Sequence, residues 1–366
     1  MHPRQLCFFE IMKNTFPDYF KEFRCIADKC PDTCCAGWEV VVDGESLKKY
    51  SELEGSYAQT LRSRIAVDSD GDSIFTPIKG RCPFLLDNGL CEMYIEIGKD
   101  SLCKTCRLFP RHITYFGARI ETGISLSCPE AARLILQDKK IEFSTEESDG
   151  FPEPTSIDPN LYFTLLEARK TSIDVLQNRN FSIEKRISAF LLLCNEISPF
   201  VRRNDCDSVR EILKKDFLSV ELSEFGQSRA NRLNSKLLKD FSSLEMLDIQ
   251  WKTALENAFS NNSFNKSHGT ENEFENLMVY FVFRYFMLAV FDKNLITKAK
   301  FAVVSFLVIR RMISCVENEK PERIKVMQRY SKEVEHSALN MDYLETQLKK
   351  SRCYGVENLI NLLQEK

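Results

Sequence analysis

Nine of the 14 cysteines in this chain fall between positions 25 and 128, and this density constrains the fold more than any other feature. The stretches around them are short and rich in turn-forming residues. Thiolates are soft ligands that bind zinc or iron strongly, and loops that share a metal ion can fold around it. The pattern therefore predicts a metal-bearing amino-terminal region. The nine residues are Cys25, Cys30, Cys34, Cys35, Cys82, Cys91, Cys103, Cys106 and Cys128.

Disulfides and ordinary buried thiols are the two alternatives to a metal site. Disulfides fit small secreted domains, whereas the residues up to Phe16 carry charges and show no continuous apolar core, so no signal peptide is expected. A chain of 366 residues is also long enough to bury a core without crosslinks. Buried free thiols suit Cys194 and Cys315, which lie in apolar helical runs. They do not explain the density of the first region.

The spacing of the cysteines leaves two kinds of metal centre open. Structural zinc sites usually show paired Cys-x2-Cys segments, and only Cys103 and Cys106 have that spacing. Because Cys34 and Cys35 are adjacent, their side chains point in different directions, and one centre does not easily use both. Iron–sulfur clusters take four thiolates from separated loops. The spacing thus favours a [4Fe-4S] cluster, with zinc as the alternative.

Four segments together resemble a known family. They are FRCIADKCPDTCCAGW at 23–38, CPFLLDNGLC at 82–91, LCKTCRLFPR at 102–111 and SLSCPEAA at 125–132. This series resembles the opening of the flagellin lysine N-methylases, and the same cysteine signature is similar to that of a broader group of iron- or zinc-chelating domains. The resemblance is dense over residues 19 to 136 and weaker around ENLMVYF at 275–281.

The resemblance implies transfer of a methyl group from S-adenosylmethionine to surface lysines of flagellin, in the bacterial cytoplasm. Cys103 lies outside the family pattern and is expected to be a spare thiol. The alternative is a non-enzymatic iron–sulfur or zinc module that senses redox state or binds a partner. The expected metal ligands are Cys25, Cys30, Cys34, Cys35, Cys82, Cys91, Cys106 and Cys128.

Charge and hydropathy exclude some classes of partner. The formal net charge is −3 and the pI is about 6.0, without the basic excess of a nucleic-acid-binding protein. The most apolar run, Phe301 to Ile309, is too short to cross a bilayer, so no membrane span is expected. Many reduced thiols then predict a cytoplasmic protein.

A change in amino-acid composition predicts a domain boundary near the middle of the chain. Residues 144–160 contain three prolines, Pro152, Pro154 and Pro159, and predict a linker. The predicted fold is α+β but mainly α: a Cys-rich, metal-bearing domain with short strands at 1–143, and an all-helical domain at 161–366. In the first, Gly55 is expected to split a helical stretch at 45–65, and two strands at 112–116 and 119–126 are expected around Gly117. In the second, Thr270 to Glu273 form a capping box that opens a buried helix.

The residues that perform catalysis are not readable from the sequence. Lysine methylation requires an unprotonated amine, an in-line methyl group and the exclusion of water. There is no Gly-x-Gly-x-x-Gly segment after a strand, so no S-adenosylmethionine site is evident. A Cys-x3-Cys-x2-Cys loop is also absent, which favours polar displacement over radical transfer. The aromatic stripe from Tyr280 to Phe286 is more typical of a core than of a lysine channel.

Four residues are candidates for cofactor binding. Trp38 could pack on the cofactor or the lysine stem, or be a core tryptophan. Asp43 could be a base or a helix cap, and Arg111 could stabilise the negative charge of a cluster. Glu130 is either a site residue or a helix-start charge. Cys128 begins the same helix, where the helix dipole is expected to lower its thiol pKa and favour a ligand role. His112 is a weak candidate ligand.

Overall fold

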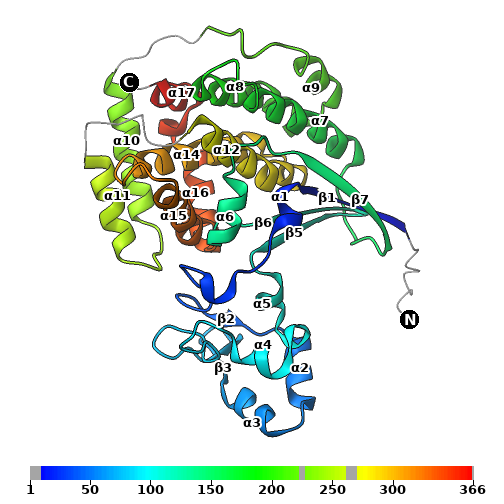
Figure 1. Cartoon of the computed structure of the whole chain (residues 1–366). Helices are drawn as coiled ribbons and strands as arrows, with labels where there is room; N and C mark the ends of the chain where they lie inside the picture. The colour runs from blue at the N-terminus through cyan, green and yellow to red at the C-terminus, as the bar shows by residue number, and fades with distance from the viewer. Residues whose placement is uncertain (1–9, 222–226, 261–269, 365–366) are drawn as a thin grey trace.

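The chain forms two lobes of unequal size in a computed structural model that describes residues 10–221, 227–260 and 270–364 (Figure 1). The large lobe packs helices against a four-stranded sheet. The small lobe holds residues 24–108, which leave the large lobe after α1 (Tyr19–Glu22) and return at β5 (Arg111–Phe116). The predicted α+β, mainly helical fold is confirmed.

The sheet of the large lobe brings together segments that are far apart in the chain. Its strand order is β5-β6-β1-β7. Strand β1 (Glu10–Pro17) runs parallel to β6 (Arg119–Ile124) and antiparallel to β7 (Phe143–Gly150). Strands β5 and β6 form the hairpin that the sequence predicts around Gly117. The short helix α6 (Pro129–Ile135) follows the hairpin.

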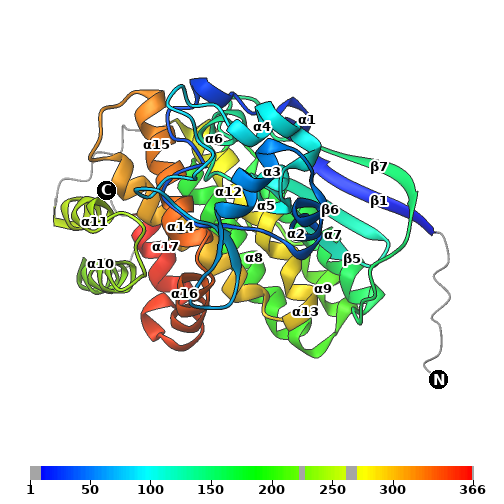
Figure 2. The same cartoon turned by 90° about the horizontal axis from the view of Figure 1, so that it is seen from below.

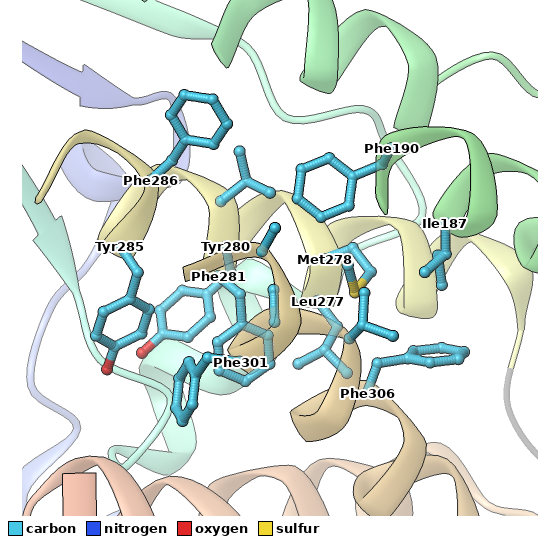
Figure 3. Close-up of a cluster of buried hydrophobic side chains, with 14 of the residues drawn as sticks. Ile187, Phe190, Leu277, Met278, Tyr280, Phe281, Tyr285, Phe286, Phe301 and Phe306 are labelled. Atoms are coloured by element: carbon cyan, nitrogen blue, oxygen red, sulfur yellow. The ribbon is translucent and has the colours of Figure 1, made fainter. Parts of the chain in front are cut away.

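Helices α12 (Glu271–Tyr285) and α14 (Leu295–Ile313) form the centre of the large lobe. Figure 3 shows Phe281, Phe301 and Phe306 between them, all three buried. The predicted capping box is present, because the Thr270 hydroxyl accepts from the Glu273 amide at 3.2 Å. The surrounding helices are α7 (Pro159–Leu176), α8 (Ile183–Arg203), α9 (Cys206–Ile212), α10 (Gln227–Ser242), α11 (Gln250–Ser260), α13 (Ala289–Asp292), α15 (Lys320–Tyr330), α16 (Ala338–Lys350) and α17 (Val356–Gln364).

One helical stretch in the described residues, Glu271–Asp292, is long and apolar enough to cross a membrane by length and composition. Of its most apolar window, 83% is buried inside the protein. The central helix of a folded lobe meets the same two criteria, so length and composition alone are weak evidence for a span.

The small lobe has a hydrophobic core of its own. It contains α2 (Gly44–Glu52), α3 (Ser56–Ser63), α4 (Glu92–Ile97), α5 (Lys104–Leu108) and a sheet of β2 (Val40–Val41), β4 (Ser73–Phe75) and β3 (Ile65–Val67). Gly55, with φ 101°, separates α2 from α3 as the sequence predicts. The buried residues are Val40, Val42, Tyr50, Leu61, Phe75, Phe84, Met93 and Cys103.

The structure divides the chain differently from the predicted boundary at 144–160. Residues 144–150 are part of β7, which pairs with all eight residues of β1. Tyr19, Phe23 and Ile124 belong to the same core as the helices, and a buried ion pair joins Glu121 of β6 to Arg169 of α7. Strand β7 is an exposed edge strand, so its sequence is polar and resembles a linker.

Candidate functional site

Three aromatic rings meet where the small lobe contacts the large lobe. Trp38 stacks on His336 with ring centroids 5.6 Å apart and an interplanar angle of 29°. Phe109 lies 5.2 Å from Trp38 and 6.1 Å from His336, measured between ring centroids. The indole Nε1 of Trp38 donates to the Cys34 carbonyl at 2.7 Å, which fixes the ring beside the cysteine loop. Residues from three distant segments therefore share one site, which we call the junction.

Two histidines lie in the junction, and they are the only two in the described residues. His336 Nε2 is 3.1 Å from Ser125 Oγ at the end of β6. Burial, with the nearby charge of Arg284, lowers the pKa of His336 to about 4 and that of His112 well below its usual value. A Cβ on Gly123 would be 2.5 Å from His112 Nε2, so only glycine permits this packing. Both imidazoles are thus uncharged at neutral pH.

A buried carboxylate lies next to the histidines. The Glu335 side chain is fully buried and accepts hydrogen bonds from Tyr285 Oη at 2.6 Å and Tyr280 Oη at 3.1 Å. Arg284 Nη1 lies 3.5 Å from the carboxylate and donates to Tyr280 Oη at 2.5 Å. Burial raises the pKa of both tyrosines. The network therefore holds one anion and one cation among neutral phenols.

The backbone at Glu335 is not regular α-helix. Residues Ser331–Glu335 form a π-helical turn between α15 and α16. Such turns inside helices occur frequently at functional sites, because the extra residue changes the direction of the side chains. Here the turn places Ser331 3.3 Å from Ser125 Oγ, while Glu335 faces the two tyrosines. Sequence reasoning missed Glu335, His336, Ser125 and Arg284.

Asp32 connects the cysteine loop to the large lobe. Its Oδ2 accepts from Gln328 Nε2 at 2.6 Å and from Lys332 Nζ at 2.7 Å. The Lys332 ammonium also lies 5.0 Å from the centroid of the Trp38 ring, within the range of a cation–π interaction. The same Gln328 amide donates to the Ser127 carbonyl at 3.0 Å. These contacts place the loop between Cys30 and Cys34 beside Cys128.

Four thiols gather on this side of the junction. A side-chain hydrogen bond with Cys35, together with burial, raises the pKa of Cys34, and the nearby charges of Cys25 and Cys128 add to the rise. The expectation that the adjacent Cys34 and Cys35 side chains point apart is therefore wrong. Burial raises the pKa of Cys30, and the charge of Cys25 adds to it. Cys128 lies at the N-cap of α6, as predicted. The expected lowering of its pKa is wrong, because burial raises it to about 11 and outweighs the hydrogen bonds from the backbone. We call Cys25, Cys30, Cys34 and Cys128 the junction thiols.

The other five thiols gather in the small lobe. The Cys82 amide donates to the Cys35 carbonyl at 2.7 Å. Cys103 is fully buried at the N-cap of α5, and Cys82, Cys91 and Cys106 pack against the same core. The predicted spare thiol, Cys103, is therefore a member of this cluster. We call Cys35, Cys82, Cys91, Cys103 and Cys106 the lobe thiols.

The chemistry of these donors fits a thiolate-bound metal centre. All 13 cysteines in the described part of the chain are free thiols. Across the ranges that the structure describes, no three His, Cys, Asp or Glu side chains yet surround a common point closely enough to hold an ion. Ligation therefore requires thiol side chains to turn toward one another. Cys194 is buried as predicted, whereas Cys315 is exposed just after α14 and does not fit the predicted buried position.

The four candidate cofactor-binding residues lie in different surroundings. Trp38 is in the junction, and Arg111 is close enough to Cys25 and Cys128 to feel their charges. Asp43 caps α2 and accepts from the Ser46 and Lys104 amides at 3.0 and 2.7 Å. Burial opposes this effect, but the hydrogen bonds lower its pKa to about 2. Glu130 pairs with Arg133 at 2.7 Å. A cofactor role for any of them stays a prediction.

A small surface hollow lies away from the junction, on α10, α11, α14 and α17. Its lining includes Leu237, Phe259 and Leu307, and none of the predicted site residues. We therefore place the candidate site at the junction, where titratable and aromatic groups converge.

Comparisons with known proteins define the class. Residues 169–362 match the model of the FliB lysine N-methylase C-terminal domain. Over 131 residues the chain is 33% identical to the flagellar biosynthetic protein FliU of Salmonella muenchen, covering 34% of this chain and 77% of that protein. The class that these matches define is that of the protein-lysine methyltransferases. The chain belongs to the FliB lysine N-methylase family.

Two further relatives are matched over a smaller share of their length. The Lysine-N-methylases of Salmonella typhimurium and Salmonella choleraesuis are each 33% identical over 131 residues. The matched region spans 34% of this chain and about a third, 32%, of each relative. No solved structure matches the chain.

Proposed function

We propose that the chain transfers methyl groups from S-adenosylmethionine to lysine side chains of flagellin, in the bacterial cytoplasm. Family membership supports lysine methylation, and the names of the relatives connect the family to the flagellum. Polar displacement at the sulfonium methyl is sufficient for an amine nucleophile. The junction is the proposed site of the reaction.

The observation that carries this proposal is the position of Glu335, buried with two tyrosines and beside two uncharged histidines. A substrate lysine must lose a proton before it can attack. His336 is exposed and uncharged, and its low pKa makes it a weak base, so its imidazole can accept a hydrogen bond that orients the amine while the proton leaves to solvent. The negative charge of Glu335 stabilises a cation at this position.

Trp38 supports the choice of lysine as substrate. An aromatic face attracts an alkylammonium, and the Lys332 ammonium already lies 5.0 Å from the Trp38 ring. A substrate lysine on this face would take the place of the Lys332 ammonium. Phe109 and the His336 ring border the same place and limit the access of water.

The cysteines are the proposed ligands of a metal centre, with an iron–sulfur cluster favoured and zinc as the alternative. A bound centre would supply crosslinks between the cysteine loops, in addition to the hydrophobic core of the small lobe. The Trp38 indole is bonded to the Cys34 carbonyl, so ordering of the cysteine loop also orders one wall of the junction. No step of the methyl transfer requires the metal.

Transfer of labelled methyl groups from S-adenosylmethionine to purified flagellin tests the proposal. Tyr285→Phe removes one hydrogen bond to Glu335 and should slow transfer about tenfold, since bonds to charged groups contribute about 1.5–3 kcal/mol. Tyr354→Phe is the matched control. Its hydroxyl donates to the buried Asp240 at 2.7 Å, away from the junction.

His336→Ala should slow transfer about tenfold, because it removes the hydrogen-bond acceptor that orients the amine. Equal losses in the Tyr285 and Tyr354 variants would move the site away from the junction. Absence of transfer by the wild-type protein, with flagellin and cofactor supplied, would favour the alternative of a non-enzymatic redox or partner-binding module.

A further inference from the structure

We infer that the free edge of strand β5 binds an extended segment of the protein substrate, which pairs with the strand and brings its lysine to the junction. The inference rests on the proposed function, because it takes the junction as the site of methyl transfer, and it adds how the substrate is recognised. The occupant is a peptide strand with apolar side chains at alternate positions and a lysine just beyond the paired residues.

The backbone of β5 has hydrogen-bonding groups that face away from the sheet. Among the described residues β5 is the last strand of its sheet, with β6 as its neighbour on one side. The Ser125 amide donates to the Pro110 carbonyl at 2.8 Å, and residue pairs of an antiparallel ladder alternate between bonded and non-bonded pairs. His112 and Thr114 therefore bond to β6. The residues whose amides and carbonyls point to the open edge are Arg111, Ile113 and Tyr115.

The two outer strands of the sheet differ in their protection against pairing. Edge strands are commonly protected by charged side chains, which discourage the addition of another strand. Strand β7 has this protection, since Glu146, Glu147 and Asp149 are exposed along it. In β5 and the turn after it, no Asp, Glu, Lys or Arg lies between Arg111 and Arg119. The edge of β5 is therefore the one that can accept a further strand.

Side chains on one face of β5 supply apolar contacts for such a strand. Ile113 is 38% exposed and Tyr115 is 43% exposed. They lie on the same face because successive side chains of a strand alternate, and Ile120 of β6 lies opposite Tyr115. Recognition by strand addition takes its affinity from main-chain bonds and its specificity from alternate side chains. This face therefore favours a substrate segment with apolar residues at every second position.

The open edge leads directly into the junction. Phe109, one of the three junction rings, lies two residues before Arg111, where β5 begins. Because a strand advances about 3.3 Å per residue, a segment paired with β5 reaches Phe109 roughly two residues beyond Arg111. The Trp38 ring is 5.2 Å from that of Phe109, so a lysine at this position can extend its side chain to the indole.

A second copy of the chain is the other occupant that an open edge could take. Stable pairs of folded proteins bury about 1,200–2,000 Å² in total. Strand β5 has six residues, and its exposed large apolar side chains are Ile113 and Tyr115. By itself this edge offers far less than such an area, whereas it suits a peptide strand that must be released after each reaction.

Proline substitution at the open edge tests the backbone pairing. Ile113→Pro removes an amide that points outward and leaves the bonds to β6 in place. We expect its KM for flagellin in methyl transfer to rise about tenfold, with kcat changed less than about twofold. Thermal melting should show that the variant stays folded.

Glu147→Pro is the matched control on the opposite edge. The Asp18 amide donates to the Glu142 carbonyl at 2.8 Å, and the same alternation places the Glu147 amide on the outer side of β7. This variant should keep the KM of the wild-type protein. Equal KM values for the Ile113→Pro and Glu147→Pro proteins would overturn the inference.

Crosslinking in the full-length protein tests the contact without a change in the backbone. A photo-crosslinking phenylalanine analogue in place of Tyr115 should attach to purified flagellin, and one in place of Phe181, exposed before α8, should not. Crosslinks only between two copies of the chain, or none from position 115 while the wild-type protein methylates flagellin, would overturn the inference. Crosslinking without methyl transfer would count against the proposed function and leave the docking at β5 standing; absence of both would overturn both.

Discussion

The indole of Trp38 and the imidazole of His336 stack at 5.6 Å, although 297 positions separate them in the chain. Trp38 belongs to the small lobe and is bonded to the cysteine loop, whereas His336 follows the π-helical turn of the large lobe. The stack therefore connects the cysteine loop to the buried Glu335 network; in Figure 2 the small lobe lies in front of the large lobe.

Trp38→Ala should remove the aromatic wall of the junction and lower methyl transfer strongly, while Trp38→Phe should retain part of it. Phenylalanine keeps a ring face for an ammonium but loses the bond to the Cys34 carbonyl. Initial rates with flagellin and thermal melting should be measured on both. Equal activity of the alanine and wild-type proteins would contradict a substrate role for this residue.

Glu275→Ala should destabilise the large lobe by about 3 kcal/mol or more, because it leaves a buried arginine without its main partner. Arg186 Nη1 lies 2.6 Å from Glu275, and both side chains are fully buried. Asp174→Ala is the control, since the Lys170–Asp174 pair is exposed and should contribute less than about 0.5 kcal/mol. Denaturant unfolding measures both, and comparable losses would refute the argument from burial.

Stability should fall as the pH drops below about 6.5, partly because of the junction histidines. Their pKa values are lower in the folded chain, with that of His336 at about 4, so the unfolded chain binds more protons in this window. The contribution is complete above the unfolded pKa and is lost progressively toward pH 4. In His336→Gln the melting temperature should depend less steeply on pH between 6.5 and 4; an unchanged slope would count against the shift.

Cys103→Ser should be costly, contrary to the expectation of a spare thiol. The side chain is fully buried in the small-lobe core, and a hydroxyl there costs about 1–3 kcal/mol if it lacks a partner. Cys315→Ser should be close to neutral because Cys315 is exposed. Thermal melting and metal content compare the two. A Cys103→Ser protein as stable as the Cys315→Ser protein would restore the first expectation.

Local patterns in the sequence predicted elements whose structure depends on neighbours in the chain. The capping box at Thr270, the break at Gly55 and the hairpin around Gly117 all follow from short-range chemistry. Strand β7 was mistaken for a linker because its exposed face is polar and its partner β1 lies more than a hundred positions away. Pairing between such distant segments leaves little trace in local composition.

The candidate site also combines features that local sequence predicts with features that depend on distant contacts. The sequence pattern assigned Tyr280 and Tyr285 to a core stripe, and both side chains are buried. Their hydroxyls, however, donate hydrogen bonds to the Glu335 carboxylate. The spacing of apolar residues along a helix predicts which side chains are buried, but not which buried hydroxyl bonds to which carboxylate. The scarcity of histidine was the available signal, since the chain has four histidines and two of them meet at the junction.

The sequence by itself determined the capping box at Thr270, the family resemblance and the presence of many metal-type donors, because these depend on residue type and local spacing. Only the tertiary structure decided that Trp38, Ser125 and His336 share one site. Contacts of that range depend on how the strands pair and how the two lobes pack, and neither is specified by residues close together in the chain.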